Sequence, residues 1–235
     1  MDYYKNDFDG WDKDKEIEYN NSEIRFRERY RFVQNAYDYL SANSIKGDYY
    51  EFGCHTGRTF RMSLSECRKK NFTGMHFYAF DSFEGLPEIK DGDNLPGFEK
   101  EALKTTEDEF DAIIKHHGLY PDKIHKVKGF YRDSLTASLA RSLKDKDSQI
   151  ALAHIDCDLY ESTVYVLRFI RELLQDGSIV YFDDYNLYRG NPNKGERRAL
   201  MEFSETTHIR FEEFMSVGWF GKAFICVEPE SKQHG

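Results

Sequence analysis

The 235-residue chain lacks the features that mark secreted or membrane-spanning proteins. Its four cysteines show no paired spacing, which favours free thiols in a reducing compartment over a disulfide framework. The first residues lack the basic and apolar regions of a secretory signal. No apolar run approaches the roughly 20 residues needed to cross a bilayer. We therefore expect a cytoplasmic protein with no membrane partner.

Basic charge is also scarce, since 33 lysines and arginines stand against 42 acids and give a net charge of −9. A protein that holds nucleic acid mainly through its phosphates needs a basic face, so we expect no nucleic-acid partner. A small anionic molecule is not excluded, because a few local arginines or lysines could bind it. Hydrophobic residues make up 40% and charged residues 32%, which is typical of a folded globular domain.

Short apolar segments alternate with helical patterns from residue 47 onward, and this alternation indicates a parallel sheet with right-handed crossovers. The expected strands cover 49–52, 76–80, 123–129, 208–214 and 222–227, with two more beginning at 150 and 178. The expected helices cover 22–40, 58–69, 101–117, 133–143, 160–174 and 196–205. We predict a doubly wound α/β fold whose mostly parallel seven-stranded sheet ends in a C-terminal antiparallel hairpin, the Rossmann-like layout of class I methyltransferases.

Residues 1–46 are expected to form an N-terminal arm and a helix that packs on the core, and residues 47–235 the main domain. Four arginines alternate with other residues in the N-terminal helix: Arg25, Arg27, Arg29 and Arg31. A helix spreads such a run around its surface. A solvated helix face is therefore the favoured interpretation of these arginines.

Two apolar runs end abruptly in acids, at Asp156-Cys-Asp158 and at Asp183-Asp184. In open α/β sheets ligands bind outside the carboxyl ends of the strands, so these acids should meet at one edge. Clustered carboxylates repel one another unless a cation lies among them, and oxygen ligands suit Mg²⁺, Mn²⁺ or Ca²⁺. The alternative is that some of these acids cap helices, which is the favoured interpretation for Asp158.

A glycine turn follows the first strand and opens the first helix of the main domain. Gly53 can adopt a positive φ, and Gly57 lets a ligand or a neighbouring backbone come close. Asp81 ends the second strand, where a carboxylate can accept from both hydroxyls of a ribose. Together with Glu51 they predict a nucleoside-cofactor site. The glycines are spaced G-x-x-x-G instead of G-x-G-x-x-G, which makes NAD the less favoured cofactor.

Five blocks, at 47–53, 81–87, 129–135, 156–163 and 183–185, resemble the macrocin O-methyltransferase (TylF/MycF-type) family. The resemblance implies a SAM-dependent and Mg²⁺-dependent O-methyltransferase that acts on a hydroxyl of a sugar or glycosylated small molecule. A homo-oligomer is compatible with it. By position it implies that the metal ligands are Asp156, Asp183 and Asp184. Together with the other residues of the glycine turn, the implied cofactor residues are Glu51, Gly53, His55, Thr56, Gly57, Asp81, Ser82, Gly129, Phe130, Asp133 and Ser134.

Three candidates stay open for the group that accepts the proton in such a reaction: Asp156, His154 and a metal-bound hydroxide. His154 lies two residues before Asp156 and so shares a strand face with it, although a histidine packed under the sheet is more common.

The loop 86–97 is long for a compact domain and is a candidate lid. Two other functions stay open. A metal-dependent glycosyltransferase could use Asp156-x-Asp158 with a nucleotide-sugar, and a non-catalytic binding protein could keep the fold.

Overall fold

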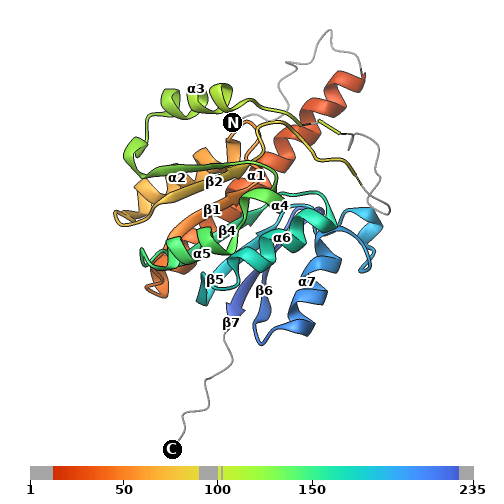
Figure 1. Ribbon diagram of the computed structural model, residues 1–235. Helices are drawn as coiled ribbons and strands as arrows, with labels where there is room; N and C mark the ends of the chain where they lie inside the picture. Colours follow the sequence, from red (N-terminus) through yellow and green to blue (C-terminus); the bar gives the residue numbers. More distant parts are fainter. Residues whose placement is uncertain (1–12, 90–99, 102, 228–235) are drawn as a thin grey trace, which may run out of the picture.

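A seven-stranded sheet forms the centre of the molecule in the computed structural model, which describes residues 13–89, 100, 101 and 103–227 (Figure 1). The strand order is β3-β2-β1-β4-β5-β7-β6. The strands are β1 (Asp48–Phe52), β2 (Phe77–Asp81), β3 (Ile124–Lys128), β4 (Ile150–Ile155), β5 (Leu174–Phe182), β6 (Arg210–Val217) and β7 (Gly221–Val227). The first five pair in parallel, and β7 pairs antiparallel with both β5 and β6. The predicted fold class is confirmed.

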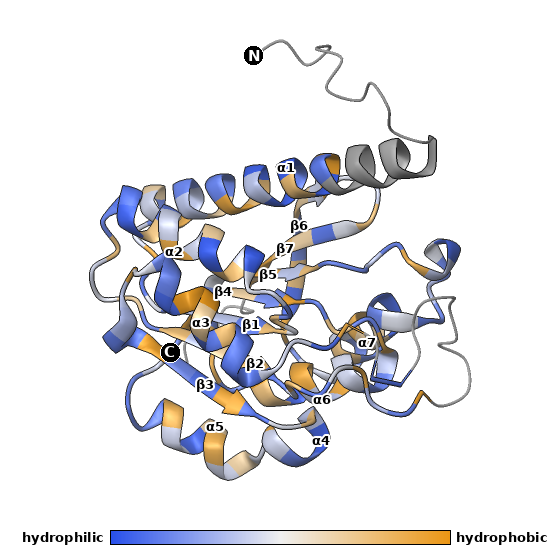
Figure 2. Cartoon of the chain, turned by 90° about the horizontal axis from the view of Figure 1, so that it is seen from above, coloured by the Kyte–Doolittle hydropathy of each residue, from blue (hydrophilic) through white to orange (hydrophobic). Residues whose placement is uncertain are grey.

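Helices cover both faces of this sheet. They are α1 (Lys13–Ala42), α2 (Arg58–Lys70), α3 (Glu107–His117), α4 (Tyr131–Ser134), α5 (Ala137–Lys144), α6 (Tyr160–Ile170) and α7 (Gly195–Thr206). Figure 2 shows α1 and α2 on one side of the sheet and α5 and α6 on the other. Successive residues of β1 point to opposite faces of the sheet. Tyr49 belongs to the hydrophobic core under α1 and α2, and Tyr50 belongs to the core under α5 and α6. None of the helices in the described residues has the length and apolar composition needed to cross a membrane.

The register of the parallel strands brings their carboxyl ends into line. Phe52 of β1 pairs with Phe80 of β2 and with Ile155 of β4, and Ile155 pairs with Phe182 of β5. The residues that follow these positions are therefore neighbours across the sheet edge, as ligand-binding residues are in open α/β sheets.

Several predicted helix boundaries were wrong for local reasons. The expected helix 133–143 is two helices, because Leu135 leaves helical geometry and Thr136 caps α5 by accepting from the Leu139 N–H. The expected helix 101–117 begins only at Glu107, where Thr106 and Glu109 form a capping box. The expected helix 160–174 ends at Ile170, and Leu174 already belongs to β5.

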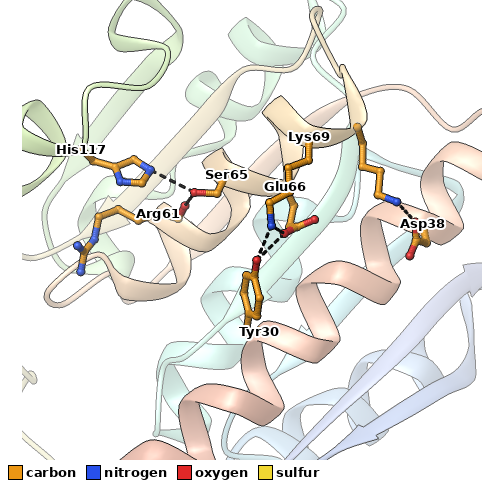
Figure 3. A network of polar contacts seen from close by, with 8 residues as sticks. Tyr30, Asp38, Arg61, Ser65, Glu66, Lys69 and His117 are labelled. Carbon is orange, nitrogen blue, oxygen red and sulfur yellow. Dashed lines mark hydrogen bonds and ion pairs between the residues drawn. The ribbon is translucent and has the colours of Figure 1, made fainter. Parts of the chain in front are cut away.

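The helix α1 is anchored to α2 through Tyr30 and Tyr37. The Tyr30 hydroxyl donates to Glu66 of α2 at 2.9 Å, and Lys69 donates to the same carboxylate oxygen at 2.5 Å (Figure 3). The Tyr37 hydroxyl and Ser63 Oγ lie 2.6 Å apart in a hydrogen bond. These contacts fix the rotation of α1 about its axis.

Candidate active site

A cavity of about 660 Å³ lies at the carboxyl ends of the parallel strands. Its wall comes mainly from the segments that follow β1, β2, β3 and β4, whereas the predicted metal ligands Asp183 and Asp184, after β5, do not line it. The predicted site residues that line it are Gly53, His55, Asp81, Ser82, Gly129, Phe130 and Asp156. The candidate lid contributes its first residues, 86–89, whereas 90–99 lie outside the described residues.

The turn after β1 requires glycine at its first position. Gly53 has φ 86°, and a Cβ there would lie 1.9 Å from the carbonyl oxygen of Asp156. Cys54 and His55 donate their backbone N–H groups to Asp81 Oδ2 at 2.7 and 3.2 Å, and Phe83 N–H donates to Oδ1 at 2.7 Å. Asp81 therefore joins the turns after β1 and β2, and it also faces the cavity.

Glu51 was predicted to belong to the cofactor pocket, but its carboxylate lies beneath the turn and does not line the cavity. The Thr59 hydroxyl donates to its Oε1 at 2.6 Å, and the Tyr49 hydroxyl donates to its Oε2. Burial raises the pKa of Glu51 to about 8, and its bonds to Thr59 and Tyr49 offset only part of that rise. The position suits a residue that supports the turn from below.

Four other predicted cofactor residues also lie outside the cavity wall: Thr56, Gly57, Asp133 and Ser134. Two of them support it. Gly57 caps α2 with φ 63°, where a Cβ would come within 3.1 Å of the Phe110 ring. Ser134 Oγ donates to the carbonyl oxygens of Gly129 and Phe130, both at 3.1 Å, and so holds the turn after β3.

The acids after β4 and β5 gather in one cluster, as the two strand ends predicted. One oxygen each from Asp156, Asp158 and Asp184 lies within 4.8 Å of the others. Atoms of His154, Asp156 and Asp183 form a second such set, so Asp156 belongs to both. Burial, then repulsion from neighbouring acids, raises the pKa of Asp156 and of Asp184 well above the ordinary value. A divalent cation at these oxygens would offset that repulsion, and the all-carboxylate donor set fits Mg²⁺.

Asp158 is not the helix cap that the sequence favoured. The residue before α6 is Leu159, whereas Asp158 has φ 60° and shares a hydrogen bond with Asp184. Burial raises the pKa of Asp158 to about 7, with the bond to Asp184 acting in the opposite direction. Asp158 lines the cavity and so joins the acids available for chemistry.

Asp183 pairs with an arginine from the far end of the chain. Arg29 Nε donates to Asp183 Oδ1 at 2.7 Å, Nη2 donates to Oδ2, and the Tyr181 hydroxyl donates to Oδ1 at 2.5 Å. Burial alone would raise the pKa of Asp183, but the bonds and charge of Arg29 outweigh it and hold the pKa below the ordinary value. The solvated interpretation of the arginine run was therefore wrong for Arg29.

His154 lies under the sheet edge instead of in the cavity wall. Its side chain is 1% exposed, and its ring meets the ring of Tyr181 edge-on with centroids 4.8 Å apart. Neither ring nitrogen has a hydrogen-bond partner among the described residues. Burial lowers the pKa of His154 to about 4, so the ring is neutral near pH 7.

Two features of the site had no signal in the sequence. Glu196 is buried, and its carboxylate accepts from the backbone N–H groups of Cys157 at 3.2 Å and Asp184 at 2.9 Å, which ties the two strand ends together. On the cavity wall, the guanidinium of Arg198 lies 4.0 Å from the ring centroid of Tyr160. The Tyr160 hydroxyl donates to Glu202 at 2.5 Å, and this hydrogen bond fixes the position of the Tyr160 ring.

The arrangement of the fold matches solved O-methyltransferases. The structure of the O-methyltransferase NovP superposes with a TM-score of 0.70 at 20% identity, covering 86% of this chain and 80% of NovP. The O-methyltransferase TomG from Streptomyces achromogenes, solved in complex with SAM, gives a TM-score of 0.54 at 10% identity over 85% and 80%. At these identities the likeness shows the fold alone, which is that of a class I methyltransferase.

Residues 21–224 match the family Macrocin-O-methyltransferase (TylF), and the chain belongs to this family. A Streptomyces olivaceus relative, 8-demethyl-8-(2,3-dimethoxy-alpha-L-rhamnosyl)-tetracenomycin-C 4'-O-methyltransferase, is 26% identical over 161 residues. That alignment covers 65% of this chain, and the chain spans 58% of the length of the curated relatives it matches.

Proposed function

We propose that the chain is a SAM-dependent O-methyltransferase whose acceptor is a hydroxyl of a sugar or a glycosylated small molecule. One observation carries the proposal: a single cavity joins the turn at Gly53 and Asp81 to the acids Asp156 and Asp158. A methyl donor and an acceptor can therefore meet in one space. Membership of the TylF family supports the reaction class, and the rhamnosyl compound in the relative's name supports the acceptor class.

The donor would lie along the turns after β1, β2 and β3. Asp81 lines the cavity, and three backbone N–H groups use three of its roughly four acceptor positions, which leaves one to accept from a ribose hydroxyl. Ser82, Gly129 and Phe130 line the adjoining wall, which suits the adenine. The absence of a side chain at Gly53 lets the donor approach the backbone closely.

The acids would hold a divalent cation, with Mg²⁺ favoured over Mn²⁺ or Ca²⁺. The resemblance implies Asp156, Asp183 and Asp184 as its ligands, whereas the structure groups Asp156 and Asp184 with Asp158 and pairs Asp183 with Arg29. When bound, such an ion lowers the pKa of an acceptor hydroxyl and helps to orient it.

The residues of the chain supply the remaining chemistry. The cavity wall positions the acceptor oxygen in line with the methyl donor, and such positioning supplies much of the rate. Asp156 and Asp158 both line the cavity, so their carboxylates are better placed than the buried His154 to take the proton of the acceptor hydroxyl.

The rival functions have less support. A glycosyltransferase could use Asp156-x-Asp158, but it does not account for the family match over 21–224. A non-catalytic binding protein would have no use for a cluster of costly buried acids, and here the cluster is complete.

Thermal unfolding with candidate ligands tests the proposal. S-adenosylhomocysteine should raise the unfolding midpoint, because a ligand that binds the folded state stabilises it, whereas UDP with Mn²⁺ should not. Methyl transfer to a panel of rhamnosides would then be measured with Mg²⁺, with EDTA, and after Mg²⁺ is restored. A midpoint raised by UDP and not by S-adenosylhomocysteine would refute the assignment.

A further inference from the structure

The strand ends offer two adjacent cation positions that share Asp156. Asp156, Asp158 and Asp184 define the first, and His154, Asp156 and Asp183 define the second, with the ligand atoms of each set within 4.8 Å of one another. His154 points to a ligand at the second position independently of the acids. Its side chain is 1% exposed, yet neither ring nitrogen has a hydrogen-bond partner among the described residues.

A cationic side chain already lies at the second position. Arg29 donates to both oxygens of Asp183, with Nε 2.7 Å from Oδ1. The two side chains are nearly closed to solvent, with 16% of Arg29 and 2% of Asp183 exposed. A guanidinium is permanently charged and fits a carboxylate in this two-bonded geometry, so it can serve as a fixed counter-ion.

Packing on α1 places this guanidinium. The residue that follows, Tyr30, is bonded to buried Glu66 of α2 (Figure 3). Phe32 lies one turn along, with its ring centroid 4.3 Å from that of Tyr181 on β5. The guanidinium itself lies 5.2 Å from the centroid of the Phe220 ring. Arg29 is therefore held at the acids by the core, unlike a surface arginine that reaches them from solvent.

We propose that Arg29 is a built-in counter-ion that fills the second cation position and so limits the acid cluster to one divalent ion. Without it, the second set would carry two carboxylates and an unpartnered imidazole with no fixed cation among them, which is a donor set for a divalent metal. Arg29 acts through Asp183 and touches no reactant, so it is a positioning residue. The inference rests on the proposed function only for the first ion.

The test counts bound Mn²⁺ per chain by electron paramagnetic resonance of the free ion, and it needs neither SAM nor an acceptor. We expect one Mn²⁺ in the wild-type chain and two in Arg29→Met. Arg29→Lys restores a positive charge and should return the count to one. Arg31→Met, on an exposed position of the same helix, is the matched control and should also bind one.

Circular dichroism and the unfolding midpoint show which variants are folded. If Arg29→Met does not fold, Arg29→Gln removes the charge while keeping a donor for Asp183, and it should bind two ions. A folded Arg29→Met or Arg29→Gln that binds a single Mn²⁺ would overturn the inference, and so would two ions in Arg29→Lys. A wild-type chain that binds S-adenosylhomocysteine but no Mn²⁺ would remove the metal from the proposed function and the inference with it.

Discussion

The two halves of the cavity are held together by different forces. In the glycine-turn half, after β1 and β2, the fixing contacts are backbone N–H groups that donate to Asp81. In the acid half, at Asp156 and Asp158 and the acids after β5 behind them, the contacts are between buried charges and polar groups, such as Arg29 with Asp183. The first half is built from residues at most 27 positions apart, the second from side chains up to 154 positions apart.

This difference has a consequence for how each half should respond to change. A backbone turn bonded to one carboxylate keeps its shape when a nearby charge is altered. A cluster of buried acids does not, because each charge sets the cost of ionising the others. The acid half should therefore control the rate of reaction, and the glycine-turn half should control affinity for the donor.

The largest expected effect comes from Asp184→Asn, which keeps the size of the side chain and removes its charge. Methyl transfer should fall on the order of 100-fold, as when a fixed electrostatic group is removed from an active site. Affinity for S-adenosylhomocysteine should change little, since Asp184 does not line the described cavity wall. Turnover and calorimetry on the same preparation measure the two. Wild-type turnover in this variant, or in EDTA, would refute a role for the metal.

Asp81→Ala is the converse experiment in the glycine-turn half. Losing the carboxylate leaves a ribose hydroxyl and the N–H groups of Cys54, His55 and Phe83 without their acceptor, a cost of about 1–3 kcal/mol, or roughly tenfold or more in affinity. Asp81→Asn keeps one acceptor oxygen and should lose less. Calorimetry with S-adenosylhomocysteine ranks the three proteins. Equal affinity in all of them would show that Asp81 supports the turn and does not contact the ribose.

The two halves also differed in how well the sequence predicted them. The turn at Gly53 and the acid Asp81 follow from local rules, because a positive φ needs glycine and a strand end needs a polar residue. The sequence also placed the four acids at one edge. It could not show that Asp158 turns toward Asp184, because that depends on its φ of 60°.

Arg29 and Glu196 were missed for a related reason. Arg29 lies in an alternating run in which nothing distinguishes it from Arg31, and only the rotation of α1 on the core turns it inward. Glu196 begins a helix, where an acid is ordinary, and its two backbone donors come from other segments. Charge pairing across a fold has no period along the chain, so pattern reasoning does not find it.

The pH dependence of the free energy of unfolding tests the glycine-turn half, because Glu51 lies beneath that turn. Its pKa rises from 4.5 to about 8 because it is buried, so between these values the folded chain keeps a proton that the unfolded chain has lost. The free energy of unfolding should therefore decrease as pH rises through this window, on the order of a few kcal/mol. Glu51→Gln cannot ionise and should flatten this decrease. The exposed Glu172→Gln is the control, and urea unfolding from pH 5 to 9 measures both. Parallel curves for Glu51→Gln and wild type would contradict the assignment.

The smallest effect is expected at Tyr160 and Arg198, a part of the cavity wall that belongs to neither half and that we propose orients the acceptor, called here the acceptor wall. Tyr160→Phe removes the hydroxyl that donates to Glu202 at 2.5 Å but keeps the ring under Arg198. One hydrogen bond to a charged group is worth about 1.5–3 kcal/mol, and the exposed carboxylate of Glu202 recovers part of it from water. We therefore expect the KM for the acceptor to rise only a few-fold, with kcat nearly unchanged, because the wall orients the acceptor and takes no part in proton transfer. Initial rates at saturating SAM give both constants. A large fall in kcat with an unchanged KM would mean that the acceptor wall acts on the acids, and that the cavity does not divide into an affinity half and a rate half.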